Sequence, residues 1–161
     1  MCCLSVLHKE ILFSLAFVDR LIHKTFLDVG GSTGVVANCF AEWFGLSPTL
    51  IDPSPDETLE ARKENIETVT AFFEDWSPQG RTFDIVGVFQ TIDHLMDLNA
   101  VFSKIREILN PNGLLILDIV DARHVALKNQ SIERATKIDH CFGFNDNTIM
   151  YYFEKIGFKV R

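Results

Sequence analysis

A glycine-rich segment is the clearest candidate for chemistry in this chain. Residues 28–34 read Asp-Val-Gly-Gly-Ser-Thr-Gly and follow a short apolar stretch. The glycine spacing differs from the G-x-G-x-x-G pattern of dinucleotide sites, and the lysine of a P-loop is absent from the segment. The leading Asp28 would repel a phosphate and suit a cationic amino group. We therefore expect a turn whose glycines let a cationic, non-phosphate ligand approach the backbone closely.

The segments around this turn alternate between strand-like and helix-like patterns. Such alternation predicts an α/β, Rossmann-like fold with a mostly parallel sheet and helices on both faces. Strands are expected at residues 25–29, 48–51, 67–73, 83–89 and 114–120, and helices at residues 9–23, 33–44, 55–65, 99–109 and 147–156. Ser54 is placed to cap the third of these helices, with Pro55 at its first position and Glu57 completing a capping box.

The remaining segments are expected to be loops, apart from the end of the chain. Loops or turns are predicted at Ser77–Gly80 and Asn110–Gly113, and residues 121–144 form a polar excursion on the substrate side. Phe158 begins a sixth strand, so the C-terminal strands are expected to be truncated. We expect one domain over residues 1–161, with an N-terminal helical segment at 1–24 and the core at 25–120.

Composition excludes several classes of function. The net charge of −7 and the scattered lysines and arginines argue against nucleic acid as a partner. None of the four cysteines forms a C-x-x-C pair, so no metal site is expected. Adjacent Cys2 and Cys3 indicate a reducing compartment, hence a cytoplasmic protein. The longest apolar run, Ile11–Val18, is too short to cross a membrane.

Several motifs together resemble one family. Residues 28–34 resemble the first motif of class I S-adenosylmethionine-dependent methyltransferases, commonly D-x-G-x-G-x-G, with Ser32 in place of the middle glycine. Residues 83–86, 109–114 and 153–158 resemble the family's strand-four motif, its L-x-P-G-G-x turn and its late L-x-x-x-G-F segment. The matches run in the family's order from Thr25 to the C-terminus.

This resemblance implies S-adenosyl-L-methionine as cofactor. Asp52 would hold the ribose hydroxyls with Pro53 against the adenine ring, and Gln90 would lie near the methionine moiety. Asp75 would accept from the adenine amino group, although Glu74 competes for that role, and Trp76 would flank the ring. The implied cofactor-binding residues are Asp28, Gly30, Gly31, Ser32, Gly34, Asp52, Pro53, Asp75, Trp76 and Gln90.

The implied reaction is methyl transfer to a small-molecule acceptor. Alignment of the reacting groups would supply most of the catalysis, and a base is needed only if the acceptor keeps its proton at neutral pH. The candidates for that base are His94, Asp121 and His140. Residues 90–93 lack an Asn/Asp-Pro-Pro-aromatic motif, which favours an oxygen, carbon or amine acceptor on a small molecule.

Two alternatives stay open at this point. The chain could be a non-catalytic S-adenosylmethionine-binding module of a larger assembly. A nicotinamide-dependent oxidoreductase of related fold is disfavoured by the glycine spacing. An uncovered edge of the sheet would favour a homodimer.

Overall fold

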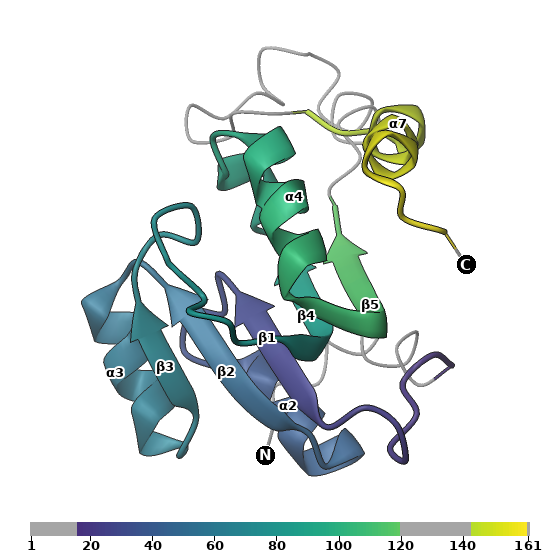
Figure 1. Ribbon diagram of the computed structural model, residues 1–161. Helices are drawn as coiled ribbons and strands as arrows, with labels where there is room; N and C mark the ends of the chain where they lie inside the picture. Colours follow the sequence, from purple (N-terminus) through teal and green to yellow (C-terminus); the bar gives the residue numbers. More distant parts are fainter. Residues whose placement is uncertain (1–15, 120–142, 161) are drawn as a thin grey trace, which may run out of the picture.

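The computed structural model describes residues 16–119 and 143–160, which form one parallel sheet with helices packed on both faces (Figure 1). The five strands lie in the order β3-β2-β1-β4-β5, and every neighbouring pair is parallel. The strands are β1 (Thr25–Val29), β2 (Ser47–Asp52), β3 (Glu67–Thr70), β4 (Phe83–Phe89) and β5 (Leu109–Asp118). The helices are α2 (Val35–Phe44), α3 (Pro55–Lys63), the 3₁₀ turn η1 (Ile92–His94), α4 (Leu98–Ile108) and α7 (Asp146–Ile156). The predicted fold class is confirmed.

Each face of the sheet has its own hydrophobic core. Successive side chains of a strand point to opposite faces, and β1 accordingly sends Phe26 to one core and Leu27 to the other. The Phe26 core is closed by α2 and α3, where Phe26 and Phe40 stack with ring centres 4.3 Å apart. The Leu27 core is closed by α4 and α7. Both faces of β1 and β4 are therefore covered, which explains their continuous apolar sequences.

The order of the strands reverses between β1 and β4. From β1 the chain proceeds outward through β2 and β3, and then returns to the other side of β1 with β4. All carboxyl ends lie at one edge, the edge of the arrowheads in Figure 1. Open parallel sheets bind ligands beyond this edge, at the point where the strand order reverses.

Local sequence signals explain where α2 ends and where α3 begins. Gly45 adopts a left-handed φ of 69° directly after α2, as its sequence position predicts. Ser54 caps α3 by accepting from the Glu57 N–H. The second half of the predicted capping box is wrong, because the Ser54 N–H donates to Asp52 Oδ1 at 2.8 Å.

The predicted first helix is wrong over its described part. Residues 16–23 form turns and irregular backbone. Asp19 Oδ1 accepts from the Leu21 N–H, and the Asp19 N–H donates to Nδ1 of the buried His23. These side-chain bonds compete with a helical ladder. Residues 9–15 lie outside the described part of the chain.

Three predicted boundaries near strands also require correction. β3 ends at Thr70 instead of Phe73. β5 begins at Leu109, and the predicted turn lies inside it as an irregularity, because the register passes from Phe83↔Leu109 to Ile85↔Leu114.

Residues 158–160 form no strand in the described structure. The Phe158 N–H instead donates to the Phe153 carbonyl, closing α7 in a Schellman motif around Gly157. The predicted excursion at 121–144 lies almost wholly outside the described residues.

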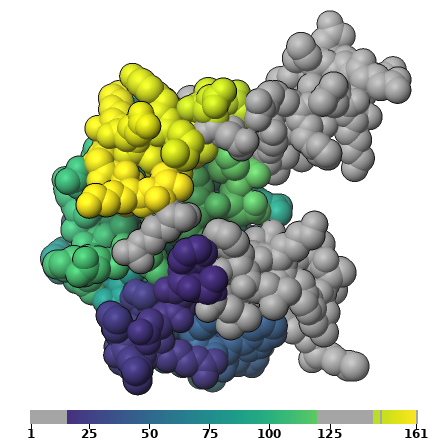
Figure 2. Space-filling model, turned by 90° about the vertical axis from the view of Figure 1, so that its right-hand side faces the viewer, coloured from purple at the N-terminus to yellow at the C-terminus, as the bar shows by residue number. Residues whose placement is uncertain are grey.

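The right-hand side of Figure 1 faces the viewer in Figure 2. Figure 2 shows α7 in yellow at one end of this face and the residues preceding β1 in purple at the other. None of the helices in the described part of the chain is long and apolar enough to span a membrane.

Candidate functional site

The loop that follows β1 is held tightly against the sheet. The Gly30 N–H donates to the Ile51 carbonyl at 2.8 Å, and the Gly34 N–H donates to the Gly31 carbonyl at 2.9 Å. Gly30 and Gly34 have φ values of 71° and 82°, a left-handed conformation that disfavours other residues. Helix α2 starts directly after Gly34.

The glycines of this loop serve internal packing. A Cβ atom on Gly30 would lie 2.4 Å from the Thr91 side chain, and one on Gly31 would lie 2.7 Å from Leu50 Cδ1. A Cβ atom on Gly34 would lie 2.6 Å from Ile66 Cδ1. The absent side chains of these glycines therefore let the loop close on the protein itself.

Ser32 occupies a left-handed position in the same loop. Its φ is 52°, in a region that costs a residue with a Cβ atom about 1–2 kcal/mol. Its N–H donates to Asp52 Oδ2 at 3.0 Å. The loop therefore keeps its shape without the middle glycine, because the carboxylate at the end of β2 fixes it.

Asp28 lies beneath the loop, at the end of β1. Its side chain is 1% exposed, and no described group donates to its Oδ2 atom. A Cβ atom on Gly31 would lie 2.8 Å from this carboxyl group. Burial, reinforced by the nearby charge of Asp52 and opposed by a hydrogen bond from the Ala37 backbone, raises the pKa of Asp28 to about 7. Asp28 is therefore a buried carboxyl group packed directly against Gly31 of the loop.

Asp52 ends β2 and joins two loops. Its Oδ2 accepts from the Ser32 N–H at 3.0 Å and its Oδ1 from the Ser54 N–H at 2.8 Å. A carboxylate has about four acceptor positions, so each oxygen can still accept another hydrogen bond. Pro53 follows it and is exposed at the same edge.

The segment after β3 places an aromatic ring that the sequence analysis missed. Phe72 is 62% exposed, whereas the adjacent Phe73 is 3% exposed. The Ala71 N–H donates to the Asp52 carbonyl at 3.1 Å, so this segment lies beside the end of β2. Two consecutive phenylalanines were the available signal, because adjacent side chains point in different directions and only one of the two can face the core.

Glu74 and Asp75, the two carboxylates of this segment, differ in whether they are already hydrogen-bonded within the protein. Glu74 Oε1 accepts from the Met96 N–H at 3.0 Å, whereas Asp75 is exposed. Asp75 is therefore the freer acceptor. Trp76 is half-buried, with its ring centre 6.1 Å from that of Phe73.

The loop after β4 brings further predicted residues to this edge. Gln90 is exposed with a φ of 50°, and Thr91 lies against Gly30. His94 belongs to η1, where its Nε2 is 4.0 Å from Asp93 Oδ1. The structure therefore places the ten predicted cofactor-binding residues at the carboxyl ends of β1 and β2 or on the segments that follow β1, β2, β3 and β4. Asp121 and His140 lie outside the described residues.

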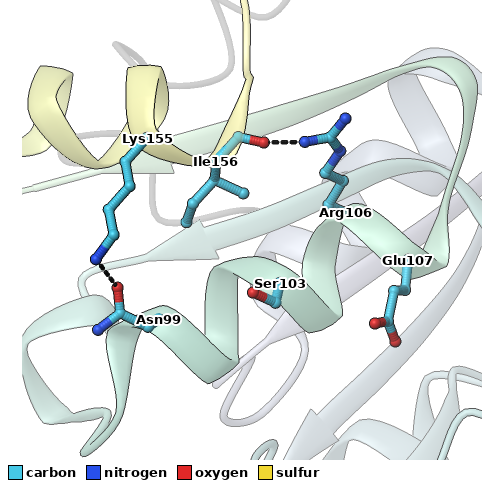
Figure 3. Close-up of a pocket in the computed structure, with 6 residues that line it drawn as sticks. All are labelled: Asn99, Ser103, Arg106, Glu107, Lys155 and Ile156. Carbon is cyan, nitrogen blue, oxygen red and sulfur yellow. Dashed lines mark hydrogen bonds between the residues drawn. The ribbon is translucent and has the colours of Figure 1, made fainter.

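A hollow of about 630 Å³ lies elsewhere, between α4 and α7 (Figure 3). Both cations that line it are already bonded across it: Arg106 donates to the Ile156 carbonyl, and Lys155 donates to Asn99 Oδ1 at 2.8 Å. These bonds attach α7 to α4. The described residues contain no group of three potential metal ligands, at this hollow or elsewhere.

Comparison with known proteins identifies the family. A family described as "Methyltransferase domain" matches residues 8–161. The ubiquinone biosynthesis O-methyltransferase of Azorhizobium caulinodans is 23% identical over 101 residues, which are 59% of this chain and 40% of that protein. The chain therefore spans less than half the length of this curated relative.

Two solved structures share the fold. A phosphoethanolamine N-methyltransferase of Haemonchus contortus, in complex with S-adenosyl-L-methionine, aligns with a TM-score of 0.71 and 18% identity, covering 93% of this chain and 36% of that chain. A methyltransferase of Thermotoga maritima aligns with a TM-score of 0.71 and 20% identity, covering 95% and 70%. The chain belongs to the methyltransferase-domain family and has the fold of class I S-adenosylmethionine-dependent methyltransferases.

Proposed function

We propose that this chain binds S-adenosyl-L-methionine at the carboxyl edge of its sheet and transfers the methyl group to a small-molecule acceptor. The observation that supports this most is Asp52. Its carboxylate is fixed by the Ser32 and Ser54 N–H groups, beside the reversal of strand order, and it keeps acceptor capacity for two ribose hydroxyls. Family membership supports the same cofactor.

The residues at this edge fit such a ligand. Pro53 and the exposed ring of Phe72 would offer apolar surface to an adenine ring, Trp76 would flank that ring, and the exposed Asp75 would accept from its amino group. Gln90, directly after β4, would contact the methionine moiety. Gly30, Gly31, Ser32 and Gly34 form the loop between these two ends of the ligand.

Asp28 would act on the ligand without touching it. Its unpartnered oxygen is buried directly beneath Gly31. A positive charge above the loop would stabilise the ionised carboxylate and lower its pKa from about 7. The carboxylate in turn favours a cation in that place, which an ammonium or sulfonium group provides.

When bound, S-adenosylmethionine supplies a methyl group activated by its sulfonium. The protein then has to orient the acceptor and exclude water, which is catalysis by positioning. His94 on η1 is the base candidate within the described residues, and Asp121 and His140 remain candidates outside them. The net charge of −7 supports a small acceptor over a polyanion.

Replacement of Asp52 tests the binding site. We expect Asp52→Ala to weaken binding of S-adenosylhomocysteine by about 1.5–3 kcal/mol, the range for hydrogen bonds to a charged group. Isothermal titration calorimetry measures this change. Asp56→Ala, which removes an exposed carboxylate from the first turn of α3, is the matched control and should bind normally. Circular dichroism checks that each variant is folded, and an unchanged dissociation constant for Asp52→Ala would refute this role.

Turnover is tested separately with S-adenosylmethionine carrying a labelled methyl group. A panel of small molecules with hydroxyl, amine or activated carbon acceptors should include compounds that gain label. Tight binding with no transfer to any member of the panel would instead favour a non-catalytic binding module.

A further inference from the structure

Lys104 on α4 donates to three main-chain carbonyl groups of one short segment. Its Nζ lies 2.9 Å from the Phe73 oxygen, 2.6 Å from the Glu74 oxygen and 2.9 Å from the Trp76 oxygen. It also lies 5.3 Å from the centre of the Phe73 ring. An ammonium group has three donors, so these carbonyls can use all of them.

The segment held in this way is a single helical turn, residues 72–76. The Phe72 carbonyl accepts from the Asp75 N–H at 3.2 Å and from the Trp76 N–H at 3.1 Å. The last carbonyls of a helical turn have no partner within it and carry partial negative charge. A cation at that end stabilises the turn, and Lys104 provides it from a different element.

A second contact holds the same turn from another side. Glu74 Oε1 accepts from the Met96 N–H, which joins the turn to the loop after β4. The two contacts leave Phe72 and Asp75 exposed beside the end of β2, where the Ala71 N–H donates to the Asp52 carbonyl.

We propose that Lys104 is a positioning residue for the adenine end of the ligand. Its ammonium fixes the turn at 72–76 and thereby holds Phe72 and Asp75 in place beside Asp52. This proposal rests on the proposed function. Loss of the ammonium would leave the turn to sample other conformations, and binding would then have to order it at a cost in affinity.

The test compares Lys104→Met, which keeps much of the side chain's length and removes the charge, with Lys104→Arg, which keeps donors for carbonyl groups. The control is Lys63→Met, because Lys63 is exposed and paired only locally with Glu60 on α3. Calorimetry measures the dissociation constant for S-adenosylhomocysteine. Fluorescence in a Trp43→Phe background reports on the single remaining tryptophan, Trp76, which belongs to the turn.

We expect Lys104→Met to bind roughly tenfold more weakly, the effect of losing one charged hydrogen-bonding group, and to shift the Trp76 emission before any ligand is added. Lys104→Arg should restore most of the affinity, and Lys63→Met should match the wild type. Should Lys104→Met fail to fold, Glu74→Ala removes the second contact and should weaken binding, whereas Glu74→Gln keeps an acceptor for Met96 and should not.

The outcomes separate this inference from the proposed function. A wild-type protein that binds S-adenosylhomocysteine, together with Lys104→Met that binds equally well, overturns the role of Lys104 alone. If Lys104→Met is unfolded, the inference is overturned when Glu74→Ala binds S-adenosylhomocysteine with the same affinity as the wild type. A wild-type protein that does not bind overturns the proposed function and this inference with it.

Discussion

At the scale of single residues, the candidate site depends on two buried acidic side chains that differ in their hydrogen bonding. Asp52 is hydrogen-bonded through both oxygens to the loops that it joins. Asp28 is buried beneath one of those loops with an unpartnered oxygen, and its pKa is raised to about 7. Asp28 therefore opposes folding when ionised, whereas Asp52 organises the site.

This difference predicts an unusual dependence of stability on pH. Between pH 3.8, the usual pKa of the group, and about 7, the folded protein holds a proton on Asp28 that the unfolded chain has lost. The free energy of unfolding should therefore fall as pH rises through this window. The shift is about three pKa units at about 1.4 kcal/mol each, so the loss attributable to Asp28 is about 4 kcal/mol at most.

Asp28→Asn tests this expectation. Urea unfolding at several pH values between 4.5 and 8 should show the variant gaining stability relative to the wild type as pH rises. Glu67 and Asp84, whose pKa values are lowered, are present in both proteins and cancel in the difference. Asp56→Asn, an exposed carboxylate, should show no such trend. Parallel stability curves for Asp28→Asn and the wild type would contradict the buried, raised pKa.

The sequence allowed the edge of the site to be predicted but not the surroundings of each residue. Asp28 and Asp52 could be placed because each ends an apolar strand. The burial of Asp28 beneath Gly31 depends on how the loop folds back, which no local pattern encodes. The exposed ring of Phe72 was missed because the strand was predicted to continue through it.

At the scale of elements, the strands with both faces covered were predicted best. The predicted bounds of β1 and β4 are those observed, because continuous apolar sequence marks burial on both faces. β5 starts earlier than predicted because Asn110 is hydrogen-bonded to the neighbouring strand: its Nδ2 donates to Asp84 Oδ1 at 2.8 Å. Asp84 Oδ2 also accepts from the N–H groups of Lys24 and Thr25. Such long-range bonds have no signal in local sequence.

The contribution of the N-terminal cap of α4 to stability can be tested by mutation. Helix α4 was predicted from Asn99, and the structure begins it at Leu98 with Asp97 as its cap, accepting from the N–H groups of Asn99 and Ala100. Asp97→Ala should lower the free energy of unfolding by about 1 kcal/mol, the usual cost of losing such a cap. Asp97→Asn keeps the acceptor and should be nearly neutral. Chemical denaturation followed by circular dichroism measures both, and equal losses in the two variants would show that capping is not the cause.

At the scale of the whole molecule, the two edges of the sheet are organised differently. The amino edge is tied together by side chains: Asp84 joins the starts of β1 and β5 to β4, and Arg81 forms a two-pronged ion pair with Glu67. Burial would raise the pKa of Asp84, but its hydrogen bonds outweigh that effect and lower it. At the carboxyl edge, loops leave Pro53, Phe72, Asp75 and Gln90 exposed. This asymmetry is what a ligand at the carboxyl edge requires.

Titration of ¹⁵N-labelled protein with S-adenosylhomocysteine, followed by amide chemical shifts, shows directly whether the ligand binds at the carboxyl edge of the sheet. We predict that the largest changes fall on the amides of residues 30–34, Asp52, Ser54, 72–76 and 90–91, at the carboxyl ends of β1, β2, β3 and β4 or directly after them. Amides beside the hollow between α4 and α7, such as those of Ser103 and Lys155, should stay unchanged and serve as the internal control. An absence of shifts at saturating ligand, or shifts centred on that hollow, would contradict a cofactor site at the carboxyl edge of the sheet.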